Sequence, residues 1–261
     1  MHTKVPNVRG LMAVIAGAVI SLAAPAYAAN FAVSPMDVTL GRGERSQTIV
    51  MTNQDEVPLR FQLKAYRWDE RPDGQMVLTP TDDVIFFPQL FDLAPHQAQN
   101  IRVGTIEPAI ESEKTYRLVM HQLKSFEAPR RVGNSERTTV VDVLTNLRIP
   151  VFVEPPAPTA QASISSLALR NSTLSFTVKN SGNAHFRIKS LRVEGFGTSA
   201  QPVFSKTTQG WYVLAGGSRN YELPVSGPEC SRVNRLNLLV EVDHSNLHSE
   251  LPITTANCAK N

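Results

Sequence analysis

Short segments in which apolar and polar residues alternate follow one another along most of this chain, and no long amphipathic helix interrupts them. The clearest example is Leu59–Trp68 (LRFQLKAYRW). Turn signals separate such segments, as at Arg71–Gly74 (RPDG) and at Gly216–Gly217. Because side chains alternate between the two faces of a strand, the pattern predicts strands. Strands at this spacing, with no helices between them, favour β-sandwiches.

A proline-rich segment divides the chain into two halves of this kind. Pro155–Pro158 (PPAP) has the composition of a stiff linker. Beyond it, Thr173–Val178 (TLSFTV) alternates as cleanly as the segments before it. We therefore expect an all-β protein with two immunoglobulin-like β-sandwich domains, over residues 29–154 and 161–261, joined by a linker over residues 155–160.

The first 28 residues have the pattern of a secretory signal peptide. Lys4 and Arg9 precede the apolar run Leu11–Ala24, and Ala26–Ala28 (AYA) is a small-x-small cleavage site. The alternative, a membrane anchor, is disfavoured because the apolar run is shorter than the ~20 residues that a span needs. Removal of this segment lowers the net charge from +3 to +1 and leaves no basic run with interleaved aromatic residues. Nucleic acid is therefore not an expected partner, and membrane insertion is not expected either.

Two cysteines, Cys230 and Cys258, lie near the C-terminus. In an exported chain such a pair usually forms a disulfide, and closing a loop of this length contributes ~3 kcal/mol in the entropy description. Two free thiols are the alternative.

The segment before the linker, Thr139–Pro155 (TVVDVLTNLRIPVFVEP), is expected to form one long strand. The residues that share one of its faces are Thr139, Val141, Val143, Thr145, Leu147 and Ile149. The other face is more mixed and reaches Pro150, which cannot donate a hydrogen bond within a sheet and so favours an edge position. An edge strand with an apolar row is open to pairing with another chain. We infer that this strand lends itself to an unfinished sheet in another protein.

With these features the chain resembles the periplasmic chaperones of chaperone–usher pili. The stretches that carry the resemblance are Phe31–Pro35 (FAVSP), Leu93–Val103 (LAPHQAQNIRV), Tyr116–Arg117, Arg148–Pro155 (RIPVFVEP), Asn180–His185 (NSGNAH) and Gly210–Gly216 (GWYVLAG). Arg148–Pro155 and Gly210–Gly216 are most similar to the archaic branch of the family. The resemblance implies two sandwiches in an L-shaped arrangement with a cleft between them, a periplasmic location, and no cofactor.

The family binds a pilus subunit that lacks its last strand and completes the subunit's sheet with a strand of its own, a mode known as donor-strand complementation. The resemblance implies that Val141, Val143, Thr145 and Leu147 enter the subunit's groove and that the chain passes the subunit to an outer-membrane usher. The polar segment Ser125–Thr138 is expected to order on binding. Self-association of the free chain through the same strand is a further expectation.

The family also holds the subunit's C-terminal carboxylate with two basic residues in the cleft, and here the sequence departs from the pattern. Those two positions fall on Asp37 and Pro150. Arg148, which shares a face with Pro150, and Arg102, expected on a neighbouring strand, are the candidates for this role, because a guanidinium binds a carboxylate in bidentate fashion. The alternative for Arg102 is a structural ion pair inside the sandwich. Glu154 stands where the family has the basic residue of a charged pair between the domains.

Two other classes of function were weighed. An exported two-domain adhesin or pilus structural subunit would need a self-complete sheet and an N-terminal extension that polymerises. A metal-dependent enzyme would need His244 and His248, four residues apart, to converge with a third ligand, although the segment around them is expected to form a turn. No nucleophile elbow, phosphate loop or dinucleotide fingerprint occurs in the sequence, so neither catalytic nor metal-binding residues are expected.

Overall fold

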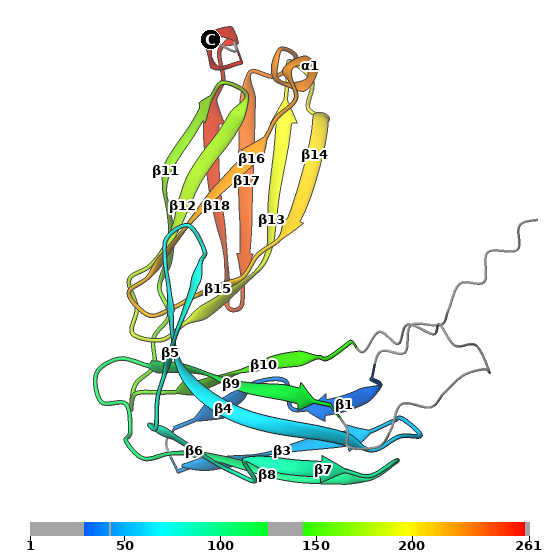
Figure 1. Cartoon of the computed structure of the whole chain (residues 1–261). Helices are drawn as coiled ribbons and strands as arrows, with labels where there is room; N and C mark the ends of the chain where they lie inside the picture. The colour runs from blue at the N-terminus through cyan, green and yellow to red at the C-terminus, as the bar shows by residue number, and fades with distance from the viewer. Residues whose placement is uncertain (1–28, 42, 125–142, 259–261) are drawn as a thin grey trace, which may run out of the picture.

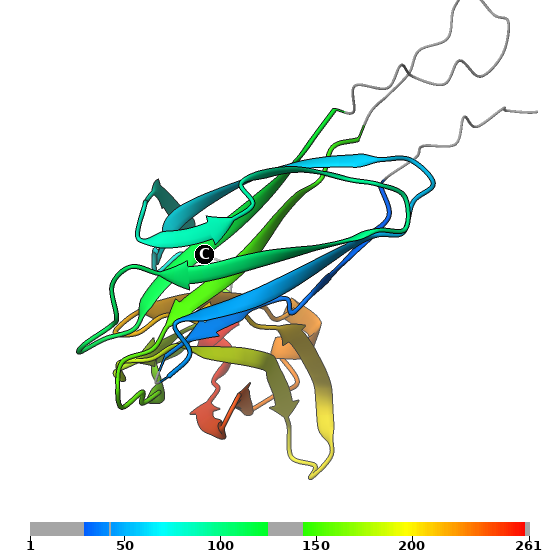
Figure 2. The same cartoon turned by 90° about the horizontal axis from the view of Figure 1, so that it is seen from below.

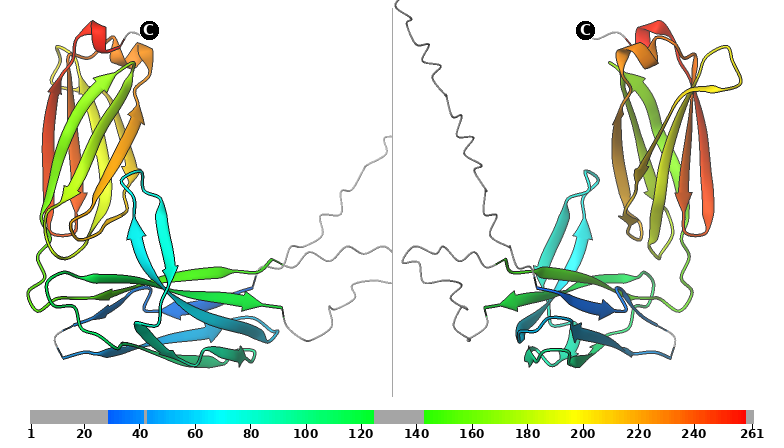
Figure 3. Two further views of the ribbon diagram at one scale, coloured as in Figure 1. Left: turned by 60° about the vertical axis from the view of Figure 1, so that its left-hand side comes forward. Right: turned by 90° about the vertical axis from the view of Figure 1, so that its right-hand side faces the viewer.

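The computed structural model describes residues 29–41, 43–124 and 143–258 as two β-sandwiches set at an angle to each other (Figure 1). The long axes of the two sandwiches run nearly perpendicular, so that the molecule has the shape of an L (Figures 1 and 3). The expected all-β fold with two immunoglobulin-like domains is therefore confirmed. The predicted Val141 and the polar segment Ser125–Thr138 lie outside the described residues.

The N-terminal sandwich has two sheets. The first has the strand order β1 (Phe31–Ser34), β3 (Ser46–Asn53), β8 (Ala98–Thr105) and β6 (Val84–Phe87). The second has the order β2 (Val38–Leu40), β10 (Asn146–Val153), β9 (Lys114–Leu123), β4 (Leu59–Glu70) and β5 (Met76–Pro80), with β7 (Leu90–Leu93) also paired to β4. The second sheet lies nearer the C-terminal domain (Figure 1).

The C-terminal sandwich also has two sheets. One has the order β11 (Ala162–Arg170), β12 (Thr173–Asn180) and β16 (Ser218–Pro224). The other has the order β14 (Pro202–Gln209), β13 (Phe186–Phe196), β17 (Arg235–Val242) and β18 (Ser245–Pro252), with β15 (Tyr212–Val213) paired to β13. A short helix α1 (Gly227–Cys230) and the 3-10 turn η1 (Thr255–Asn257) lie at the far end. The expected disulfide between Cys230 and Cys258 joins these two elements and is confirmed.

Each domain has its own apolar core, built from the inward-facing alternate residues of its strands. One buried asparagine has the same role in both domains, Asn53 at the end of β3 and Asn180 at the end of β12. The side-chain amide of each donates to three main-chain carbonyls, which belong to Val57, Leu93 and Ala94 for Asn53, and to Ala184, Val213 and Leu214 for Asn180. These bonds tie together the loops at one end of each sandwich.

Among the described residues, the strand before the linker begins later than the sequence predicts, and residues 139–142 lie outside the described part of the chain. The segment Thr139–Pro155 was expected to be one strand, whereas β10 covers only Asn146–Val153. Thr145 precedes it without strand pairing, although its carbonyl accepts a hydrogen bond from the amide of Gln122 at 3.0 Å. β9 and β10 run side by side along the sandwich (Figures 1 and 2). The pairing partner, and not the alternation of residue types, fixes where the strand begins.

Candidate functional site

One side of β10 is free over the first part of its length. β9 pairs with β10 along all of Asn146–Val153, whereas β2 pairs with it only over Val151–Val153. No other described strand pairs with the side of Asn146–Pro150 that faces away from β9. Because Pro150 lies just before the residue opposite Val38, where β2 begins, its missing N–H removes no bond to that neighbour. The free edge can therefore accept a further strand.

The two faces of β10 have different surroundings. Leu147 and Ile149 point into the core of the N-terminal sandwich, as their shared face in the sequence predicted. Arg148 and Pro150 lie on the opposite face, which we call the inner face because it is turned toward the C-terminal domain. Before the strand begins, Val143 is 48% exposed.

An arginine on the inner face is buried, and two of its nitrogens have no hydrogen-bond partner among the described residues. Arg117 lies on β9, directly opposite Pro150 of β10 and Tyr66 of β4, and it is only 3% exposed. Its guanidinium carbon lies 3.6 Å from the centroid of the Trp68 ring. Within the described part of the chain, neither its Nε nor its Nη2 has a hydrogen-bond partner. The buried Nε1 of Trp68 is likewise without an acceptor there.

The surroundings of Arg117 explain its electrostatics. The pKa of Arg117 is lowered to about 10, mainly by burial and to a smaller extent by the positive charge of Arg148, while Tyr212 and Glu70 act in the opposite direction. The guanidinium is therefore still charged at neutral pH. A buried cation with free N–H donors is costly until an acceptor arrives, and a carboxylate offers two acceptor oxygens in matching geometry. This site is suited to bind a carboxylate.

The two arginines predicted from the sequence lie in different places. Arg148 is exposed on the same face as Arg117. It lies two residues before Pro150, the residue of β10 that is opposite Arg117. Arg102 lies on β8, in the other sheet, where it is exposed and donates to the hydroxyl of Ser46 at 2.9 Å. Arg102 is thus neither a neighbour of Arg148 nor an ion-pair partner inside the sandwich. The expectation that the two strands are neighbours was wrong, because alternation does not tell which of two sheets a strand joins.

Sequence reasoning missed Arg117 as a binding residue. It identified the Tyr116–Arg117 pair only as a landmark. A signal was present, because Leu118–Met120 is apolar at three successive positions, which is typical of a strand covered on both faces. An arginine in such a strand is expected to be buried, and a buried charge needs a partner.

Two ion pairs and a set of stacked rings join the domains. Glu113, which directly precedes β9, accepts from the backbone N–H of His185 at 2.9 Å, and its carboxylate lies 2.8 Å from the ring Nδ1 of His185. The His185 ring stacks on Phe152 of β10, with 3.6 Å between centroids. The second ion pair is formed by Glu70 and Arg219. The charged contacts between the domains thus lie at positions other than Glu154.

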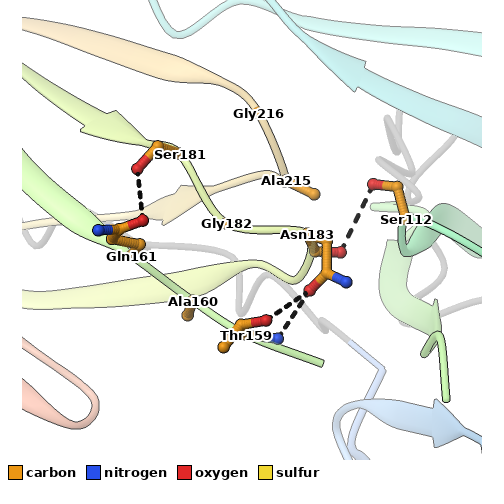
Figure 4. Close-up of a pocket in the computed structure, with 9 residues that line it drawn as sticks. All are labelled: Ser112, Thr159, Ala160, Gln161, Ser181, Gly182, Asn183, Ala215 and Gly216. Atoms are coloured by element: carbon orange, nitrogen blue, oxygen red, sulfur yellow. Dashed lines mark hydrogen bonds between the residues drawn. The ribbon is translucent and has the colours of Figure 1, made fainter. Parts of the chain in front are cut away.

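The hollow at the hinge is lined by uncharged residues (Figure 4). It measures ≈ 690 Å³ and is lined by Ser112, Thr159, Ala160, Gln161, Ser181, Gly182, Asn183, Ala215 and Gly216. The Asn183 side chain accepts from the amide of Thr159 at 2.7 Å and donates to the carbonyls of Glu111 and Ala157. It therefore ties the linker to both domains, and this hollow is part of the hinge.

The histidines weighed as metal ligands do not share a helix. His244 lies in the two-residue turn between β17 and β18, and His248 lies on β18 opposite Leu239. In residues 29–41, 43–124 and 143–258, no three His, Cys, Asp or Glu side chains gather as a metal site. No helix of the described chain has the length and apolar character needed to cross a membrane.

Comparison with known proteins places this geometry in context. Residues 30–159 match the family model described as pili and flagellar-assembly chaperone, PapD N-terminal domain. No curated protein sequence matches the chain.

Several solved structures are similar over most of both chains. The SafB chaperone, solved with the SafA pilin of Salmonella enterica, is 14% identical with a TM-score of 0.58, covering 87% of this chain and 99% of that one. The CsuC–CsuE chaperone–tip adhesion subunit complex from archaic Csu pili of Acinetobacter baumannii is 14% identical with a TM-score of 0.56, and the match covers 85% of this chain and 98% of that one. The class 5 fimbriae chaperone CfaA is 14% identical with a TM-score of 0.52, and the match covers 86% of this chain and 100% of that one. At these identities the similarity establishes the two-domain fold.

Proposed function

We propose that this chain, which belongs through its N-terminal half to the PapD-type chaperones of pilus assembly, captures an unfinished pilus subunit on the free edge of β10 and holds the subunit's C-terminal carboxylate on Arg117. The subunit then passes to an outer-membrane usher. No ATP or cofactor enters this scheme.

The observation that carries the proposal is the unpartnered guanidinium of Arg117 beside the free edge of β10. A strand added along Asn146–Pro150 would run past the inner face, where Arg117 lies directly opposite Pro150. A carboxylate at the end of that strand would satisfy the Nε and Nη2 donors. Arg148, exposed on the same face, would add a second positive charge.

The apolar row of the donor segment supports the same scheme. Val143 and Leu144 are exposed, and Thr145 and Leu147 are partly buried. Together with Val141, the residues Val143, Thr145 and Leu147 would enter the subunit's groove. Each buried Val or Leu contributes ~1.5–3 kcal/mol before ordering costs. The same free edge and exposed residues support self-association when no subunit is present.

The location and the branch of the family are proposals of the same kind. The signal-like segment over residues 1–28 and the family together support a periplasmic protein. The stretches Arg148–Pro155 and Gly210–Gly216 support the archaic branch. Similarity to solved structures does not separate the branches, because archaic and other fimbrial chaperones are equally identical to this chain.

The test is co-expression of the tagged chain in the periplasm with the pilin-like subunits encoded beside it. We expect one subunit to be degraded when expressed alone and to be recovered in a one-to-one complex with the chaperone. Isolation of the chaperone without a subunit, beside a subunit that is stable and soluble by itself, would contradict the proposal and favour an exported adhesin or structural subunit instead.

A further inference from the structure

A hairpin of the N-terminal domain extends beyond its own sheet. β4 pairs with β9 only as far as Arg67, and its remaining residues pair with β5 alone. We call the projecting residues, 68–78, the arm. Figures 1 and 3 show the arm standing out from the sheet toward the C-terminal domain. At its tip Gly74 has φ +83, and a side chain there would collide with Arg219, since an added Cβ would lie 2.6 Å from Nη2.

The arm contacts the C-terminal domain at β16. The carboxylate of Glu70 pairs with the guanidinium of Arg219, and the backbone N–H of Asn220 donates to the carbonyl of Pro72 at 2.7 Å. Among the described strands β16 pairs with β12, and the arm contacts the other edge of β16 at Asn220. In both views of Figure 3 the arm and the linker stand on opposite sides of the base of the C-terminal domain. The arm thus adds a contact between the domains on the side opposite the linker.

The arm also carries the residue that supports Arg117. Trp68 lies at the base of the arm, and its ring is the surface on which the Arg117 guanidinium rests. The same ring meets Tyr212 of the C-terminal domain edge-on, with 5.5 Å between centroids. Movement of the arm away from the C-terminal domain would therefore displace the support of Arg117 and admit water to its N–H groups.

The ion pair at the middle of the arm is buried. The side chain of Glu70 is 6% exposed and that of Arg219 is 20% exposed. The groups that face Glu70 are Arg219 and Tyr221 on β16 and Arg117 on β9. Burial raises the pKa of Glu70 to about 7, although Arg219 and Arg117 both act to lower it.

We propose that Glu70 and Arg219 form a latch that holds the arm against the C-terminal domain, and that the latch positions Arg117 through Trp68. The proposal rests on the proposed function only in that Arg117 receives the subunit's carboxylate. Glu70 acts here as a positioning residue, because it does not itself touch the subunit.

The latch responds to pH in a defined direction. When the arm opens, Glu70 meets water and its pKa returns toward the ordinary carboxyl value of 4.5, whereas in the closed arm it is about 7. Closing therefore takes up a proton, so below pH 7 the closed latch is a neutral Glu70 carboxyl whose carbonyl oxygen accepts from Arg219, and above pH 7 it is an ion pair. The closed arm is most stable below pH 4.5 and loses stability as the pH rises through 7. Between pH 5 and pH 8 the equilibrium constant for closing is expected to fall on the order of 10- to 100-fold.

The test measures hydrogen exchange of the Asn220 amide in the free protein by NMR, and it needs no subunit. This amide is protected only by its bond to Pro72 on the arm. After correction for the intrinsic exchange rate, we expect its protection to fall on the order of 10- to 100-fold between pH 5 and pH 8. The amide of Val225, which donates to the carbonyl of Ser172 within the C-terminal domain, is the internal control and should not change.

Three variants separate the latch from general stability. In Glu70→Gln the Asn220 protection should lose its pH dependence, and in Arg219→Met the amide should exchange rapidly at both pH values. Glu250→Gln removes an exposed carboxylate of the pair with Arg235 and should behave as the wild type. The Arg117 Nε–H signal should exchange faster in Arg219→Met.

Three results would overturn the proposal: Asn220 protection that is equal at pH 5 and pH 8 in the wild type, a pH profile that survives in Glu70→Gln, or an Arg117 Nε–H that is insensitive to arm opening. If Arg219→Met does not fold, the pH profile of Glu70→Gln decides the question. If the wild type shows the expected pH profile of Asn220 protection but captures no subunit, the result would count against the proposed function and not against the latch.

Discussion

Replacing Arg117 by methionine should weaken subunit capture without weakening the fold. Methionine keeps an unbranched apolar chain on the Trp68 ring and removes the charge. In the free protein the guanidinium is buried with two donor atoms unpartnered in the described chain, so it costs free energy that the contact with Trp68 offsets only in part. Stability and binding should therefore change in opposite directions, which is unusual for a buried residue.

The magnitudes follow from the surroundings of Arg117. Burial lowers its pKa to about 10, well below the ordinary value of a guanidinium, which corresponds to a folding cost of ~3 kcal/mol at most. This cost is fully present at pH 7, because both the folded and the unfolded forms are protonated there. Loss of the contact with Trp68 opposes the gain by ~2 kcal/mol. The net gain is ~1 kcal/mol, or a rise in Tm of ~2–4 °C for a chain of this size.

Binding should fall by a larger amount. Truncating one partner of a buried charge pair costs ~2–5 kcal/mol, so at ~3 kcal/mol the affinity for the subunit falls ~100-fold. The assays are thermal unfolding of the free chaperone, followed by circular dichroism, and recovery of the co-expressed subunit. Arg102→Met, on the other sheet, is the matched control and should leave both unchanged. A Tm that falls by several degrees, or a subunit recovered at the wild-type level, would refute the reasoning.

Three further substitutions test the donor segment and the fold. Val143→Asp should abolish recovery of the subunit while the free protein still folds, since Val143 is exposed; capture that survives would show that this strand is not the donor. Replacing both Cys230 and Cys258 by alanine should lower the free energy of unfolding by ~3 kcal/mol in urea titrations, and an unchanged midpoint would contradict the entropy description. Asn180→Ala should cost ~3 kcal/mol or more, because three buried carbonyls lose their donor; a loss below ~1 kcal/mol in the same titration would mean that water replaces the amide.

Much of the fold follows from local pattern. The alternation in Leu59–Trp68 places it within β4, and Arg71–Gly74 marks the turn of the β4–β5 hairpin. The shared face of Leu147 and Ile149 follows from a period of two, which holds wherever one face of a strand is buried. These features depend on neighbouring residues and need no knowledge of the other domain.

The length of the donor strand did not follow from local pattern. The alternation of Thr139–Pro155 continues through Thr145, yet β10 begins at Asn146, where pairing with β9 begins. Strand boundaries depend on a partner that is distant in sequence. For the same reason, the sequence led us to expect Arg102 and Arg148 on neighbouring strands, whereas the two residues lie in different sheets.

The sequence by itself determined the two sandwiches, the linker, the disulfide and which face of β10 each residue takes, because these depend on alternation, on composition and on the compartment. Only the tertiary structure decided that Arg117 is a buried cation on the inner face and that Glu70 meets Arg219, 149 residues away. The physical reason is that burial and charge pairing arise where the two domains meet. Where the two domains pack together, Arg117 is buried, and no described residue accepts a hydrogen bond from its Nε or Nη2.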